Sequence, residues 1–135
     1  MIIVDTTTLV AILRDEPERR QFTERIEAAE RCFMGAASLL ETRIVLRARR
    51  GNSAIVSLHS LISEIGVDVV DVTKETAEIA FVAFREFGKA TGSPAGLNFS
   101  DCFSYAPAKE LDLALLFKGR NFAQTDIVAA TEQRV

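Results

Sequence analysis

The chain has 135 residues, a length that suits one domain whose core needs neither disulfides nor a structural metal. Apolar residues make up 48% of it, but no apolar run approaches the roughly 18 residues that span a bilayer, and no basic region of a signal peptide opens it. The formal net charge of -3 argues against strong, sequence-independent binding of nucleic acid. One histidine and two cysteines outside any C-x-x-C pair argue against a disulfide framework and a Cys/His zinc site, so a cytoplasmic protein with reduced thiols is expected.

The first half of the chain alternates short apolar runs with amphipathic segments. Apolar runs without polar alternation are typical of strands buried on both faces, and spacings of three and four residues are typical of helices. In chain order we expect strand 1–5, helix 6–13, helix 17–29, strand 32–34, helix 36–49 and helix 53–65. Gly51 and Gly66 would end the last two helices.

The same alternation continues in the second half. We expect strand 67–70, helix 73–87 opened by Thr73-x-x-Thr76, a loop at 88–98, a helix beginning at Asp101 with Ser100 as its N-cap, strand 113–117, and a short fifth strand at 127–129. Strands that alternate with helices predict an α/β layered domain with a parallel sheet of four to five strands. No internal linker is visible, so a single domain over 1–135 is expected.

Four polar residues fall where such a sheet would gather them. Asp5 ends the first strand, Asp101 begins a helix after a loop, Asn121 follows the fourth strand, and Glu41 lies in the helix after the second strand. Ligands of open parallel sheets bind beyond the carboxyl ends of the strands, so we hypothesise that these side chains converge. The alternatives are an Asp5 that only caps the next helix, a Glu41 solvated beside Arg43 and Arg47, and an Asp101 that only complements a helix dipole.

Oxygen ligands without histidine or cysteine suit a hard cation such as Mg²⁺ or Mn²⁺. Carboxylates crowded together repel one another, and a cation would explain their clustering as well as the negative net charge. Such an ion can turn a water molecule into a nucleophile and offset charge on a phosphodiester. Metal-assisted hydrolysis is therefore the chemistry that these residues favour.

Four segments, taken in order, resemble the PIN-domain ribonucleases, and within them the VapC-type toxins of toxin–antitoxin pairs. The segments are Ile3-Val4-Asp5-Thr6-Thr7-Thr8-Leu9-Val10-Ala11-Ile12, Ala37-Ser38-Leu39-Leu40-Glu41-Thr42, the stretch from Gly96 to Tyr105 around Asp101, and the stretch from Leu115 to Ile127 around Asn121. Each alone is a weak motif, but together they span nearly the whole chain.

The resemblance implies a three-layer α/β/α fold and an Mg²⁺- or Mn²⁺-dependent endoribonuclease. By position, Asp5, Glu41 and Asp101 would be the metal-binding and catalytic acids, and Thr6 would be a hydroxyl partner of that site. It also implies a VapB-type antitoxin as partner, a homodimer with higher toxin–antitoxin assemblies, and contact with DNA only through the antitoxin.

Two positions depart from the family pattern. Asn121 stands where many members carry a fourth aspartate, so this corner of the site lacks a charge, and Asp126 is a candidate substitute for it. The alternative function is accordingly a catalytically weak or inactive member that binds RNA or antitoxin. Pro107 lies inside the helix near Asp101, and proline removes a helical hydrogen bond, so that helix is expected to be short or bent.

Basic side chains near the acids suggest where RNA would lie. Arg43, Arg47, Lys118 and Arg120 are candidate phosphate contacts, although arginines on a helix are more often only solvated. A second alternative function is a phosphatase or phosphotransferase with a nucleophilic aspartate at the end of its first strand. The phosphate-binding lysine pattern that such an enzyme requires is not evident in the sequence.

Overall fold

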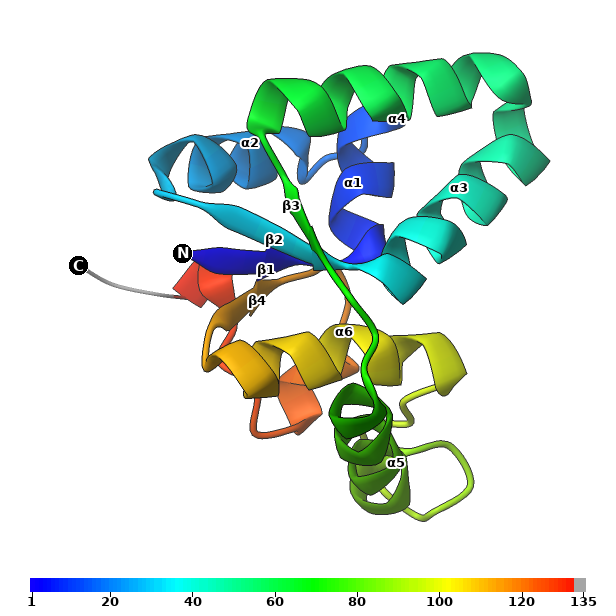
Figure 1. The fold of residues 1–135 in the computed structure, drawn as a ribbon, viewed down its shortest axis with the longest axis vertical. Helices are drawn as coiled ribbons and strands as arrows, with labels where there is room; N and C mark the ends of the chain where they lie inside the picture. Colours follow the sequence, from blue (N-terminus) through cyan, green and yellow to red (C-terminus); the bar gives the residue numbers. More distant parts are fainter. Residues whose placement is uncertain (133–135) are drawn as a thin grey trace.

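The computed structural model describes residues 1–132 and shows a four-stranded parallel sheet with helices on both faces (Figure 1). The strands are β1 (Ile2–Val4), β2 (Cys32–Gly35), β3 (Asp68–Val70) and β4 (Ala114–Leu116), arranged in the order β3-β2-β1-β4. Ile3 pairs with Phe33 on one side and with Leu115 on the other, which places β1 at the centre of the sheet.

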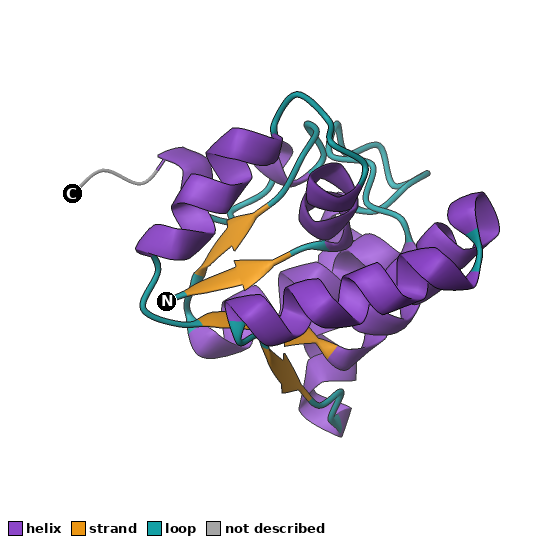
Figure 2. Cartoon of the chain, turned by 90° about the horizontal axis from the view of Figure 1, so that it is seen from above, coloured by secondary structure: helices purple, strands orange, loops and turns teal. Residues whose placement is uncertain are grey.

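Helices α1 (Thr6–Leu13), α2 (Arg19–Ala28), α3 (Ala36–Arg50) and α4 (Asn52–Ile65) lie on one face of the sheet. Helices α5 (Lys74–Phe87) and α6 (Phe99–Leu111) and the short 3-10 helix η1 (Phe122–Gln124) lie on the other. Figure 2 shows the molecule from above, with helices lying across the strands. A second short 3-10 helix, η2 (Ala130–Glu132), follows near α2 and β4. The three-layer α/β/α architecture expected from the sequence is confirmed. None of the helices in the described part of the chain has the length and apolarity that a membrane crossing requires.

Alternate residues of the strands belong to two separate cores. Ile2 and Val4 pack with α1 to α4, whereas Ile3 points to the opposite face and packs with α5 and α6. Leu116 and Leu115 divide in the same way in β4. Both faces of the central strands are therefore buried, which is why their sequences are continuously apolar rather than alternating.

The expected helices are present, with ends that local chemistry explains. The Thr73 side chain accepts the Thr76 N–H and the Thr76 side chain accepts the Thr73 N–H, both at 3.1 Å, so the predicted start of α5 is confirmed. Gly66 ends α4 in the left-handed conformation, with φ of 74°. The expected N-cap Ser100 is wrong, because α6 begins at Phe99 and Asn98 caps it.

The expected fifth strand is reduced to a single bridge. Ala129 pairs with Leu115 in an isolated parallel bridge, and the Leu115 N–H donates to the Val128 carbonyl at 2.9 Å. The chain turns into η2 at Ala130, so the pairing does not continue. The sheet accordingly has four strands within residues 1–132.

Helix α6 continues through Pro107 for 13 residues, so the expectation of a short helix is wrong. Pro107 is buried against Gly35, where β2 passes into α3. A Cβ atom at Gly35 would lie 3.1 Å from the Phe103 carbonyl oxygen and 3.2 Å from Pro107 Cγ. Glycine therefore permits the close approach of α6 to the start of α3.

This close approach gives a test of packing. Gly35→Val should lower the free energy of unfolding by about 1–3 kcal/mol, because the added methyl groups overlap the α6 backbone. Urea denaturation measures the change. The matched control is Ala48→Val on the exposed face of α3, which should cost only about 0.5 kcal/mol through helix propensity. Equal losses in the two variants would contradict the proposed role of Gly35.

Candidate active site

Asp5 lies at the carboxyl end of β1 with only 3% of its surface exposed. Its Oδ2 atom accepts the Thr7 backbone N–H at 3.1 Å and the Thr7 hydroxyl at 2.6 Å, so Asp5 caps α1. Its Oδ1 atom accepts a short hydrogen bond from the Ser104 hydroxyl of α6. The cap predicted as an alternative for Asp5 is thus real, and the same carboxylate also binds a helix from the opposite face of the sheet.

Burial raises the pKa of Asp5 above its ordinary value. The hydrogen bonds from Ser104 and Thr7 oppose that rise, and the charge of Glu41 adds to it. Three hydrogen-bond donors therefore stabilise the ionised form of Asp5, but burial still makes ionisation unfavourable relative to water. A cation next to this carboxylate would favour the ionised form.

Asp101 lies in the first turn of α6, where it closes a reciprocal cap with Asn98. The Asn98 side chain accepts the Asp101 N–H at 2.8 Å, and Asp101 Oδ2 accepts the Asn98 N–H at 3.0 Å. The Asn121 amide nitrogen donates to the same Oδ2 atom at 3.4 Å. Burial raises the pKa of Asp101, and the negative charges of Asp5 and Glu41 raise it further.

Glu41 lies on α3, half-buried, and its charge acts on the pKa of both aspartates. The structure therefore brings together the four polar residues expected at this edge of the sheet: Asp5, Glu41, Asp101 and Asn121. Among residues 1–132, no basic side chain is one of the groups that shift the pKa of either aspartate. Three acids thus share a region to which the described residues bring little positive charge.

A buried hydroxyl network holds the helices that carry these acids. The Ser38 and Ser104 hydroxyls lie 3.0 Å apart and join α3 to α6. The Thr6 hydroxyl donates to the Ser38 carbonyl at 3.1 Å, and the Thr42 hydroxyl donates to the Thr6 hydroxyl at 3.0 Å. Because α1, α3 and α6 each contribute a hydroxyl, the network fixes the three acid-bearing elements relative to one another.

The sequence predicted Thr6 as a hydroxyl partner of the site, and the structure shows which hydroxyls bond to Asp5 itself. Thr6 bonds to Ser38, whereas Thr7 and Ser104 bond to Asp5. Thr7 has a local signal, because it occupies the second position of a helix that an aspartate caps. Ser104 also has one, since it follows Asp101 by three residues and so shares its helix face.

Asp126 has other partners than the acid cluster. The Tyr105 hydroxyl donates to Asp126 Oδ1 at 2.8 Å, and Lys109 Nζ donates to Asp126 Oδ2 at 2.8 Å. Both of its oxygens are therefore occupied by groups one and two turns along α6 from Asp101. The structure therefore pairs Asp126 with Tyr105 and Lys109 and not with the acid cluster in which it was expected to replace the missing charge.

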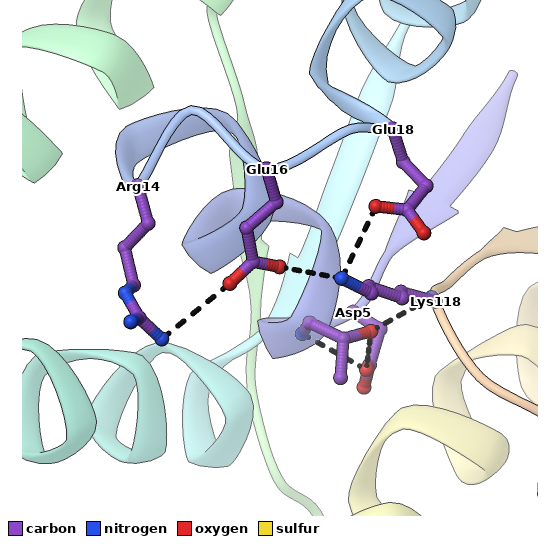
Figure 3. Close-up of polar contacts among 6 residues, drawn as sticks. Asp5, Arg14, Glu16, Glu18 and Lys118 are labelled. Carbon is purple, nitrogen blue, oxygen red and sulfur yellow. Dashed lines mark hydrogen bonds and ion pairs between the residues drawn. The ribbon is translucent and has the colours of Figure 1, made fainter.

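The candidate RNA contacts fall into two groups. Arg43, Arg47 and Arg120 have exposed side chains, the first two on the helix that carries Glu41. Lys118 is different, because its Nζ atom lies 2.9 Å from Glu16 Oε1 and 3.1 Å from Glu18 Oε1. Its charge is therefore directed toward two glutamates (Figure 3).

The acids fit a hard divalent cation by the chemistry of their donors. Asp5, Glu41 and Asp101 offer carboxylate oxygens, and Asn121 offers an amide. Within the described residues no three acidic, imidazole or thiol groups lie close enough to bind one ion directly. Mg²⁺ commonly binds one or two carboxylates and keeps several water ligands, so a site with fewer than three direct acidic ligands suits this ion.

Comparisons with known proteins all find similarity to the same family. The family model of the PIN domain matches residues 2–128. Ribonuclease VapC30 of Mycobacterium tuberculosis is 42% identical over 126 residues, covering 93% of this chain and 95% of that protein. Ribonuclease VapC28 of the same organism is 40% identical over 133 residues, covering 98% and 100%.

Solved structures share the fold at lower identity. The crystal structure of Mycobacterium tuberculosis VapC20, described as a sarcin–ricin loop cleaving toxin, superposes with a TM-score of 0.75 at 20% identity, covering 95% of this chain and 97% of that one. A toxin–antitoxin complex from Klebsiella pneumoniae superposes with a TM-score of 0.70 at 15% identity, covering 99% and 100%.

The raised pKa of Asp101 predicts how stability depends on pH. A raised folded-state pKa means that ionisation destabilises the folded chain, so stability is lost as pH rises from the ordinary value of 3.8 through the raised one. Asp101→Asn removes the charge and keeps an oxygen for the Asn98 N–H. Without divalent ions, this variant should therefore be more stable than the wild type at pH 7, and the gain should shrink toward pH 4.

Thermal unfolding in a chelator at the two pH values measures this difference. The matched control is Asp112→Asn, an exposed position in the left-handed conformation that asparagine tolerates. A destabilised Asp101→Asn at pH 7, with the control unchanged, would show that the carboxylate is not under electrostatic strain.

Proposed function

This chain belongs to the PIN-domain family and, within it, to the VapC ribonucleases, and from that premise we propose that it is an Mg²⁺- or Mn²⁺-dependent endoribonuclease, the toxin of a toxin–antitoxin pair. The observation that carries the proposal is the convergence of Asp5, Glu41 and Asp101 from three elements, with the pKa of both aspartates raised. Oxygen donors that are costly to ionise without a cation are what a metal-dependent hydrolase requires.

Each residue has a defined part in the proposed mechanism. Asp5 and Asp101 would hold the ion, Glu41 would complete the acidic set, and Asn121 would add a neutral amide oxygen. When bound, such an ion makes a water molecule more acidic and offsets charge on the scissile phosphate. Ser104 and Thr7 fix both oxygens of Asp5, and Asn98 fixes one oxygen of Asp101, so the acids are oriented before substrate arrives.

RNA is the proposed substrate. Ribonucleases that are 40% and 42% identical to this chain support it, as does a structural neighbour described as cleaving the sarcin–ricin loop. The exposed guanidinium groups of Arg43, Arg47 and Arg120 would contact phosphates beside the acids. A phosphotransferase with Asp5 as nucleophile is not favoured, because the phosphate-binding lysine pattern that such an enzyme requires is not evident in the sequence.

The proposed partner is a VapB-type antitoxin. A basic side chain from such a partner would find three carboxylates at the site, which favour arginine or lysine. Structural neighbours that are toxin–antitoxin complexes support this pairing. We further propose a homodimer with higher toxin–antitoxin assemblies, contact with DNA only through the antitoxin, a cytoplasmic location, and one PIN domain over 1–135.

Cleavage of RNA by the purified chain tests the proposal. With Mg²⁺ or Mn²⁺ the wild type should cleave structured RNA, and a chelator should stop it. Asp5→Asn and Asp101→Asn should each lower the rate by at least about 100-fold, since each removes a carboxylate that would hold the ion. Glu41→Gln should also lower it.

The controls are Asp112→Asn and Glu110→Gln, which change exposed acids of the same types away from the site. Both should cleave at the wild-type rate. Undiminished cleavage by Asp5→Asn and Asp101→Asn would rule out the assigned site, even if the chain is a ribonuclease.

A substitution at Asn121 distinguishes the proposed enzyme from the catalytically weak alternative. Its amide donates to Asp101, and an aspartate there would place another negative charge beside that carboxylate. Asn121→Asp should therefore tighten the binding of Mg²⁺, by about tenfold if one charged ligand adds roughly 1.4 kcal/mol. Calorimetric titration with Mg²⁺ measures the affinity.

The cleavage rate of the same variant decides between the two functions. A gain of a few fold would indicate that the natural chain is already an effective enzyme. Cleavage detectable only in Asn121→Asp would instead support the alternative of a catalytically weak member that binds RNA or antitoxin.

A further inference from the structure

Lys118 lies at the centre of a charged cluster close to Asp5, and its ammonium pairs with two glutamates of that cluster. The cluster consists of Arg14, Glu16, Glu18 and Lys118 (Figure 3). Lys118 Nζ is 2.9 Å from Glu16 Oε1 and 3.1 Å from Glu18 Oε1, and Arg14 Nη1 is 3.4 Å from Glu16 Oε2. These residues come from the loop that follows α1 and from the segment that follows β4.

Within residues 1–132, Lys118 is the basic residue that forms an ion pair with Glu18. Glu18 Oε1 is shielded from solvent, and the hydrogen bond from Lys118 lowers the pKa of the Glu18 carboxyl. The Lys118 ammonium is the positive charge that faces it. Loss of this ammonium would leave the shielded Oε1 atom of Glu18 without its partner, which favours a shift of the side chain or the loop toward solvent.

The backbone of Lys118 connects this cluster to Asp5. The Lys118 N–H donates to the Thr7 hydroxyl oxygen at 3.0 Å, and the Thr7 hydroxyl donates to Asp5 Oδ2 at 2.6 Å. A hydroxyl has a single proton. Because its oxygen already accepts the Lys118 N–H, the Thr7 proton is directed to Asp5, and the position of the Lys118 backbone determines how well that bond forms.

The same segment carries Asn121. Only Gly119 and Arg120 separate Lys118 from the amide that contacts Asp101, and Gly119 has a φ of 107°, which favours glycine. The position of Lys118 therefore also affects the contact between Asn121 and Asp101. The Lys118 side chain is thus placed to influence both Asp5 and Asp101.

We propose that Lys118 is a positioning residue of the nuclease site, anchored by Glu16 and Glu18, that orients Asp5 through Thr7 and sets the approach of Asn121 to Asp101. The inference rests on the proposed function for its effect on catalysis. It replaces the expectation that Lys118 contacts RNA, because both glutamates already engage its ammonium.

Three variants test the proposal by steady-state kinetics on RNA. Lys118→Met and the double variant Glu16→Gln/Glu18→Gln should each lower kcat by about 10- to 100-fold with KM nearly unchanged, as expected when the groups that orient a metal-binding side chain are lost. Combining them should lower kcat little further, since both break the same cluster. Lys118→Arg should restore most of kcat, because guanidinium also pairs with carboxylates.

The matched control is Lys89→Met, which removes an exposed lysine outside the cluster and should leave kcat unchanged. A direct phosphate contact would give a different pattern. Lys118→Met would then raise KM at constant kcat and make the salt dependence of RNA binding shallower by about one unit, while the glutamate variant would cleave normally. That pattern would overturn the proposal.

Amide hydrogen exchange supplies a readout that needs neither metal nor substrate. Exchange at the Lys118 and Thr7 N–H groups should quicken by at least about tenfold in Lys118→Met and in the glutamate variant, but not in Lys89→Met, if the cluster holds these bonds closed. Unchanged exchange would overturn the proposal. If Lys118→Met does not fold, Glu18→Gln alone gives the same comparison. A wild type that cleaves no RNA would contradict the proposed function, whereas the exchange result would still test the anchoring.

Discussion

A carboxylate sealed inside a protein must have a hydrogen-bond donor for each oxygen, and Asp5 imposes this requirement on the structure around it. Water cannot supply the donors, because Asp5 is almost fully buried at the end of the central strand. Thr7 of α1 supplies two and Ser104 of α6 supplies one. Since α1 and α6 lie on opposite faces of the sheet, satisfying one side chain joins both outer layers.

The basic side chain near the site pairs with other residues and does not neutralise the acids, so the negative charges of the acids act on one another. Lys118 lies close to Asp5 along the chain of hydrogen bonds, yet its ammonium binds Glu16 and Glu18. Burial and mutual repulsion then raise the pKa of Asp5 and Asp101. A site with this imbalance attracts a divalent cation or a basic side chain of a partner, and both outcomes suit the toxin of a toxin–antitoxin pair.

The sequence predicted what depends on pattern and missed what depends on tertiary pairing. Apolar runs located all four strands, and strand-end placement brought Asp5, Asp101 and Asn121 to one edge. The sequence predicted Ser100 as the cap, and serine and asparagine can both cap a helix, so only the reciprocal bond between Asn98 and Asp101 shows that Asn98 is the cap. The Ser104–Asp5 bond spans 99 residues and the pairing of Lys118 with Glu16 spans 102. Local sequence places Ser104 on the helix face of Asp101, but it specifies neither of these two long-range partners.

The titration of the Asp5 carboxyl, followed by ¹³C NMR with and without Mg²⁺, tests most directly whether burial makes this group costly to ionise and a cation relieves the cost. Without metal, Asp5 should titrate above the ordinary value of 3.8, because burial outweighs its three donors. With Mg²⁺ its pKa should fall. An Asp5 that titrates at or below 3.8 without metal, and does not respond to Mg²⁺, would contradict the assignment of this carboxylate as the centre of a metal-dependent site.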